Sequence, residues 1–305
     1  MSISLVRTRI GGRFRLKTRI GSGSFGEVYE AVDIIEMVDV AIKLERVDRT
    51  RSSLEHEVTV YKNLGRMVGI PRARWFGAED GYDVLVLDLL GPSLASSPPG
   101  GEPCLAFKLL WCLAIKWCLA ILERLHARDY IHRDIKPSNF LFGPEPLSQK
   151  VFLVDFGLAK QYRDPIQHLH IPYRDGLQLT GTALWASVNV HVGIAHSRRD
   201  DLESLAYVII YLLRGYLPWQ DLATDDIFHR KQSLSPAALC HDLPLELTTF
   251  VTYIRSLPFT GDPDYLYLHH LLQSATERVG SEPACIGRPY NGKGTCRPLP
   301  SEGEY

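Results

Sequence analysis

The sequence has almost no net charge. Its 305 residues include 34 basic and 35 acidic side chains, which gives a formal net charge of −1. Proteins that bind nucleic acid or anionic membranes through charge usually carry a clear basic excess. The composition therefore gives no support for such a partner, and we expect no binding to nucleic acid.

Cysteine is also scarce. No two cysteines form a CxxC pair, and no Cys/His spacing suits zinc. The six cysteines are Cys104, Cys112, Cys118, Cys240, Cys285 and Cys296. This pattern favours reduced thiols over a disulfide framework, with the first three buried on a helix. We therefore expect a cytoplasmic location, with the nucleus as a second compartment.

A long uninterrupted hydrophobic run is missing as well. The chain begins Met-Ser-Ile-Ser-Leu, without the apolar core of a signal peptide. The most apolar stretch, 104–125, is interrupted by Lys108, Lys116, Glu123 and Arg124. Charges placed in this way argue against a membrane span, and they favour a buried helix that continues to about Arg128.

The most informative stretch is the run HRDIKPSN at 132–139. Its carboxylate, Asp134, can accept a proton from a hydroxyl group, and its cation, Lys136, can steady the charge on phosphoryl oxygens. The amide oxygen of Asn139 can hold a metal ion. These types and offsets suit phosphoryl transfer, and the alternative is a surface loop that happens to be charged.

A glycine-rich stretch lies near the N-terminus. Bare backbone N–H groups beside glycines can approach phosphate oxygens closely. The residues concerned are Ile20, Gly21, Ser22, Gly23, Ser24, Phe25, Gly26, Glu27 and Val28. A plain turn remains the alternative. The residues that follow are rich in β-formers, so we expect a hairpin and not the strand-to-helix turn of a dinucleotide site.

The short apolar strand predicted at 40–44 contains one lysine, Lys43. A lysine there is costly unless it points to water or has an anionic partner. The next predicted helix, 53–64, offers Glu57 and Glu55, which point about 160° apart, so only one of them can face the site. We choose Glu57 as the partner of Lys43.

Two further carboxylates stand at the ends of predicted elements. Asp155 follows the apolar strand at 151–154 and precedes Phe156-Gly157, where it could contact a metal ion that bridges two phosphates. Asp201 lies at the start of a helix predicted over 200–214. It is either a simple cap or a brace that accepts backbone N–H bonds from the 132–139 loop.

Taken together, the chain resembles the protein kinases, and within them the casein kinase I family. The resemblance runs from about Phe14 to about Leu272 and rests on the strings IGSGSFGEVY, VAIKLE, LLGPSL, IHRDIKPSNFL, VDFGLAKQYRD, HIPYRDGLQLTGTA, ASVNVHVGIAHSRRDDLESL and LLRGYLPWQ. It implies a mixed α+β, bilobal fold. We expect a leader at 1–13, a kinase domain at 14–278 divided after residue 90, and a disordered tail at 279–305.

The resemblance also implies the roles of the site residues. ATP and Mg²⁺ would be bound, with Asp134 and Lys136 catalytic, Asn139 and Asp155 holding the metal, and Lys43 with Glu57 holding phosphates beside the glycine-rich loop. The adenine would lie among Ile20, Val28, Ala41, Leu90 and Leu141. The lysine after the aspartate, Lys136, resembles the serine/threonine kinases. The substrates would be proteins, and the chain would act as a monomer.

Several departures from the family qualify this picture. Leu177 and Leu184 stand where the family has basic residues associated with phosphorylated or acidic substrates. Leucine cannot pair with an anion, so we expect weakened recognition of such primed substrates. The 95–103 loop, a short 223–235 segment and an altered C-terminus also differ. A degenerate kinase that acts as a binding module is the alternative function, and a small-molecule kinase of similar fold is a third.

Overall fold

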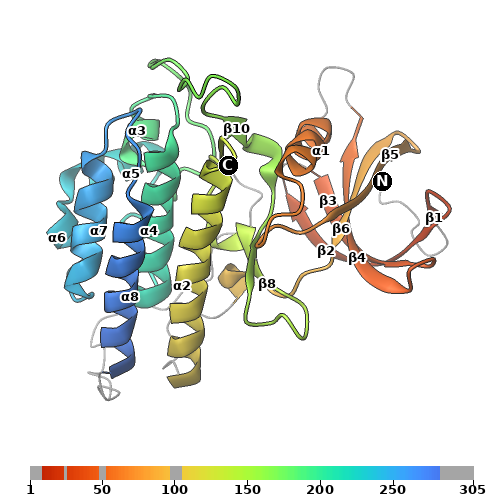
Figure 1. Cartoon of the computed structure of the whole chain (residues 1–305), viewed down its shortest axis with the longest axis horizontal. Helices are drawn as coiled ribbons and strands as arrows, with labels where there is room; N and C mark the ends of the chain where they lie inside the picture. The colour runs from red at the N-terminus through yellow and green to blue at the C-terminus, as the bar shows by residue number, and fades with distance from the viewer. Residues whose placement is uncertain (1–8, 24–25, 48–52, 97–104, 282–305) are drawn as a thin grey trace.

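The computed structural model describes residues 9–23, 26–47, 53–96 and 105–281. The N-terminal part is an antiparallel sheet of six strands in the order β1-β2-β3-β4-β6-β5 (Figure 1). These strands are β1 (Arg9–Ile10), β2 (Phe14–Gly23), β3 (Gly26–Asp33), β4 (Val38–Arg46), β5 (Ala73–Glu79) and β6 (Tyr82–Asp88). The helix α1 (Ser53–Leu64) packs against β5 and β6.

The alternation of side chains along β4 explains how the sheet presents its site residues. Val40, Ile42 and Leu44 are buried in the core of the sheet, together with Phe14 and Tyr29. Because successive strand residues point to opposite faces, Lys43 lies on the other face. Lys43 pairs in register with Val28 of β3 and with Leu85 of β6.

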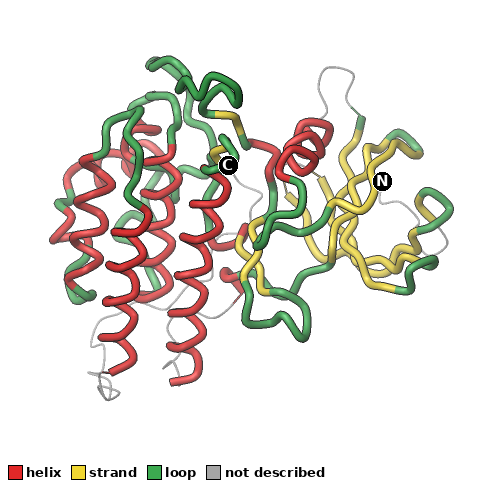
Figure 2. Tube along the Cα trace, viewed as in Figure 1, coloured by secondary structure: helices red, strands yellow, loops and turns green. Residues whose placement is uncertain are grey.

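The C-terminal part is mainly helical, as Figure 2 shows. Its longer helices are α2 (Leu105–His126), α4 (Arg198–Arg214), α5 (Thr224–Ser233), α7 (Leu245–Ser256) and α8 (Tyr265–Ser281). Its shorter elements are η2 (Leu94–Ser96), β7 (Tyr130–Ile131), η3 (Pro137–Asn139), β8 (Phe140–Phe142), β9 (Val151–Leu153), η4 (Phe156–Leu158), β10 (Lys160–Gln161), α3 (Val188–His191) and α6 (Pro236–Leu239). One apolar core joins α1 and β6 to α2, α4 and α7. The expected α+β fold of two lobes is confirmed.

The sheet begins before Phe14, the residue at which the kinase domain is predicted to start. Arg9 and Ile10 pair with β2, although both lie in the stretch expected to be a leader. Arg13 holds the buried Asp33 through Nε at 2.8 Å and also binds Glu36. The hydrogen bond from Arg13 is the main reason why the pKa of Asp33 falls to about 2.

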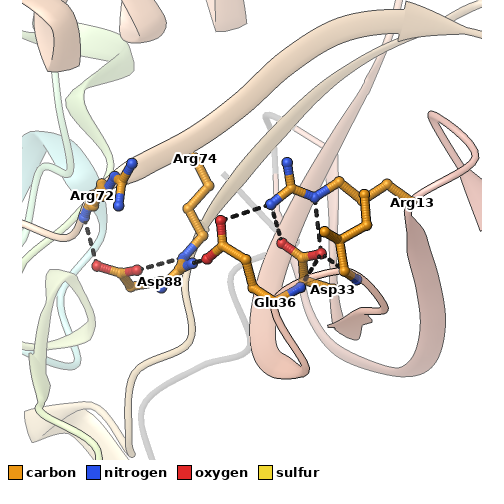
Figure 3. Close-up of polar contacts among 7 residues, drawn as sticks. Arg13, Asp33, Glu36, Arg72, Arg74 and Asp88 are labelled. Carbon is orange, nitrogen blue, oxygen red and sulfur yellow. Dashed lines mark hydrogen bonds and ion pairs between the residues drawn. The ribbon is translucent and has the colours of Figure 1, made fainter.

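This ion-pair chain continues toward the end of β6, as Figure 3 shows. Glu36 accepts from Arg74 at 2.7 Å, and Arg74 donates to Asp88 at 2.6 Å. Asp88 also accepts the backbone N–H of Arg72. The turn between β3 and β4 is thereby tied to β5 and to the residues that lead into the C-terminal lobe.

The last described helix, α8, runs past the predicted end of the domain at 278 and packs against α2 and α7. The predicted tail from 282 onward lies outside the described residues, as does 97–103 of the predicted loop. Leu94–Ser96 forms a short 3₁₀ turn at the edge of that loop. None of the helices described is long and apolar enough to span a bilayer.

Candidate active site

The buried carboxylate of Asp201 holds the loop that follows β7. Asp201, near the start of α4, accepts the backbone N–H of His132 at 2.7 Å and that of Arg133 at 2.9 Å. Burial by itself would raise the pKa of Asp201, but the hydrogen bond from His126 and the contacts with His132 hold it below its usual value. Asp201 therefore braces the loop, which is the second of the two roles that the sequence leaves open for it.

Asp134 lies in this braced loop and is enclosed by three partners. Its Oδ1 accepts from both the backbone N–H of Thr182 at 2.9 Å and the Thr182 hydroxyl at 2.8 Å. Its Oδ2 lies 3.2 Å from Nζ of Lys136. The Asn139 amide donates to the backbone carbonyl of Asp134 at 2.9 Å. Asp134, Lys136 and Asn139 therefore converge, and Thr182 joins them from a distant segment.

A second group of charges connects the two lobes. Nζ of Lys43 donates to Glu57 Oε2 and to Asp155 Oδ1, both at 2.8 Å. Burial would lower the pKa of Lys43, but the two carboxylates more than offset this and raise it. Burial would likewise raise the pKa of Asp155, and Lys43 reverses that effect. Lys43 and Asp155 are thus favoured in their charged forms, whereas burial raises the pKa of Glu57. Glu55, the runner-up, has an exposed side chain.

Phe156 joins α1 to the braced loop. Its backbone N–H donates to Glu57 at 3.2 Å, and its ring makes edge contacts with Tyr61 and His132, each at a centroid distance of 5.1 Å. Asp155 itself has a left-handed backbone with φ of 67°. Such conformations are costly for a residue with a side chain and persist where the surroundings fix them. The contacts of Phe156 help to fix Asp155 in place.

Asn139 and Asp155 suit a magnesium ion by their chemistry. Both offer oxygen, the donor that this hard cation prefers. The Asn139 amide uses its nitrogen on Asp134, which leaves its oxygen for another partner. Asp155 accepts from Lys43 through Oδ1, and its second oxygen, Oδ2, can serve as a metal ligand. The residues that the sequence predicts as metal ligands therefore fit that ion.

The glycine-rich stretch forms the predicted hairpin between β2 and β3. Gly21 pairs with Val28 and Gly23 with Gly26, while Ser24 and Phe25 lie outside the described residues. Gly26 has φ of 121°, and a Cβ there would lie 2.0 Å from the Leu44 carbonyl oxygen, so a side chain is excluded. At Gly26, therefore, only the backbone can face a ligand.

The side chain of Glu27, in contrast, is engaged elsewhere. It accepts from Arg19 at 3.0 Å and from the Tyr29 hydroxyl at 2.8 Å. These contacts leave its backbone as the part that could contact a nucleotide.

The apolar residues expected around an adenine are partly or largely exposed. Ile20 is 52% exposed, and Val28, Ala41, Leu90 and Leu141 are intermediate. Leu141 forms a bridge with Ser93, so β8 lies beside the connection that leads out of β6. On β4, Ala41 pairs with Leu87 across the strands.

A family model of the protein kinase domain matches residues 14–240. The chain belongs to the protein kinase family. This assignment supports a transferase that acts on protein substrates and uses ATP with a divalent metal. Of the site residues predicted from sequence, all those described fall within the matched range.

In this protein kinase, sequence reasoning missed how the segment after Thr182 is held. Nζ of Lys231 on α5 is buried and donates to the carbonyls of Ala183 at 2.8 Å and Ala186 at 2.6 Å. Nε1 of Trp219 donates to the Leu184 carbonyl. The acceptors are backbone carbonyls, and no local pattern in the sequence links α5 to them.

The two leucines of interest differ in their surroundings. Leu177 is 46% exposed, and its backbone N–H donates to the Gly193 carbonyl. Leu184 is partly buried and packs against the main core. A cavity of about 40 Å³ lies beside Leu177 and is lined by two cations, Arg133 and Lys160. Some positive charge therefore remains near this segment although Leu177 and Leu184 carry none.

Proposed function

We propose that the chain is an active serine/threonine protein kinase of the casein kinase I type. The observation that carries this proposal is the enclosure of Asp134 by Lys136 and Thr182, together with the contacts of Lys43 with Glu57 and Asp155 across the lobes. A degenerate kinase would be expected to have lost one of these groups, and each is present with the required chemistry.

In this mechanism the substrate hydroxyl oxygen forms a bond to the γ-phosphorus of ATP, and the bond from that phosphorus to the β–γ bridging oxygen breaks. Asp134 accepts the hydroxyl proton, and Lys136, 3.2 Å away, offsets charge on the transferred group. Magnesium, when bound, neutralises charge on the phosphate oxygens. Asn139 and Asp155 would hold it, and Lys43 would orient the α- and β-phosphates.

We further propose a weak preference for primed or acidic substrates. Leu177 presents an exposed apolar side chain, and Leu184 is turned toward the core. Neither can form the charge-assisted hydrogen bonds that an anion requires. A cytoplasmic or nuclear location and a monomeric state complete the proposal; both rest on the sequence.

The decisive experiment is transfer of radiolabelled phosphate from ATP to casein with magnesium. The wild-type chain should label casein on serine and threonine, and Asp134→Asn should lose most of this activity while it still binds ATP, because binding does not use the base. Asp226→Asn, an exposed aspartate of α5, is the matched control and should label normally. Absence of label with the wild-type chain, or full activity of Asp134→Asn, would refute the proposal.

A further inference from the structure

The helix α8 lies beyond the residues that match the kinase family, yet it reaches the support of the catalytic loop. Figure 1 shows α2, α4 and α8 side by side. The first residue of α8, Tyr265, places its hydroxyl in hydrogen-bond contact with Nδ1 of His126, at the end of α2. Nε2 of His126 lies 2.9 Å from Oδ2 of Asp201. A connected row therefore runs from α8 to the brace of the loop.

The protons in this row can be placed by elimination. The Asp201 carboxylate can only accept, so Nε2 of His126 must donate to it. Burial lowers the pKa of His126, whose side chain is 1% exposed, so the ring is neutral near pH 7 and Nδ1 has a lone pair. The Tyr265 hydroxyl can donate to that lone pair. For the neutral ring, this arrangement satisfies both nitrogens at once.

The same carboxylate oxygen serves the loop. Oδ2 of Asp201 accepts from His126 and from the backbone N–H of His132, while Oδ1 accepts from the N–H of Arg133. Asp134, the proposed base, follows directly. Any change in how His126 holds Asp201 is therefore passed to the backbone that carries Asp134.

We propose that Tyr265 is a positioning residue: its hydroxyl fixes the Nε2–H form of His126 and thereby holds Asp201 against the catalytic loop. Without that hydroxyl, Nδ1 is a buried acceptor with no donor, and the ring can recover a partner only by moving or exchanging its proton. Either change removes the donor from Asp201. The contact chain itself is independent of the proposed function; only its effect on turnover rests on it.

The test replaces Tyr265 by phenylalanine, which removes one hydroxyl and keeps the ring. Amide hydrogen exchange at His132 and Arg133 is followed by NMR in the full chain. Exchange should become about tenfold faster at these two amides, and kcat should fall about tenfold with the KM for ATP unchanged. Tyr267→Phe, on the same helix and 37% exposed, is the control and should change neither quantity.

A second variant tests the coupling. His126→Asn shortens the side chain and should also speed exchange at the two amides. The double variant with Tyr265→Phe should exchange no faster than His126→Asn alone, because the hydroxyl then has no imidazole to orient. Effects that multiply, or unchanged exchange in Tyr265→Phe, would overturn the proposal. The exchange result stands whether or not the chain transfers phosphate, so it is separable from a failure of the proposed function.

Discussion

Lys43 and Glu57 lie on different elements, β4 and α1, and their charged groups meet at 2.8 Å. Asp155, 112 residues further along the chain than Lys43, meets the same ammonium group at the same distance. One side chain thus connects the sheet, the helix α1 and the segment that follows β9. The N-terminal lobe is held by this ammonium in the arrangement that the proposed chemistry requires.

Replacing Lys43 by methionine should therefore lower kcat/KM by about 10²-fold or more, because a fixed cation directed at the phosphates is lost. The stability of the fold should fall as well, because the buried Glu57 loses its cationic partner. Steady-state phosphorylation of casein measures the loss. Lys17→Met provides the control, because Lys17 is on the same sheet but pairs with Glu30 and Asp39 away from the site. Equal losses in the two variants would contradict the role of Lys43.

The hydroxyl of Thr182 should contribute to kcat, although Thr182 lies far from Asp134 in the sequence. Thr182→Val removes the 2.8 Å bond to Asp134 and leaves the backbone N–H bond in place. A hydrogen bond to a charged group contributes about 1.5 kcal/mol, so kcat should fall about tenfold. The measurement is single-turnover phosphorylation. Thr252→Val, at an exposed position on α7, should retain the wild-type rate.

Introducing a cation at position 177 should create a selectivity for phosphorylated substrates that we propose the wild-type chain lacks. Leu177→Lys places an ammonium on an exposed side chain near Arg133 and Lys160. A solvent-exposed ion pair contributes up to about 1 kcal/mol, so the rate on a phosphorylated peptide should rise about fivefold relative to its unphosphorylated twin. Ile166→Lys, at an 87% exposed site, controls for the added charge alone. A strong preference for the phosphorylated peptide in the wild-type chain would contradict our account.

Arg13→Ala should destabilise the fold more than the loss of an unpaired surface arginine would, because the buried Asp33 carboxylate keeps only its backbone donors. The pH dependence gives a second readout. The pKa of Asp33 is about 2 in the fold, below its ordinary value of 3.8, so its contribution to stability is present above pH 3.8 and is lost as the pH falls toward 2.

Urea unfolding between pH 2 and pH 7 measures both effects. The Arg13→Ala variant should lose less stability than the wild-type chain over the acid part of this range. Arg15→Ala, on an exposed residue of β2, should behave as the wild-type chain does. Parallel acid curves for wild type and Arg13→Ala would count against the pairing.

Much of the fold could be predicted from local patterns. The alternation in β4 and the helical spacing in α1 predicted elements that the structure contains. Helix geometry indicated that only one of Glu57 and Glu55 could face the site, and Glu57 is the one that contacts Lys43. The brace by Asp201 was foreseen as one of two roles because the dipole at a helix start favours a carboxylate. In each case the signal lay within a few residues.

The remainder depends on contacts between distant segments. Arg13 was assigned to a leader because two strand residues, Arg9 and Ile10, are too few to give a periodic signal. Lys231 donates to backbone carbonyls, and Tyr265 contacts a histidine. In both cases the partner lies far away in the sequence, and a single sequence does not indicate such pairs. The packing of α5 and α8 decides which polar groups come into contact, and only the folded structure shows that packing.

The match to the kinase family begins at Phe14 and stops at Cys240. Tyr265 lies past that limit. A recombinant fragment trimmed to the matched range would therefore lack α8 and would leave the imidazole of His126 without its phenolic neighbour. Low activity of such a fragment would then reflect the position of the truncation and not a defect in the catalytic residues.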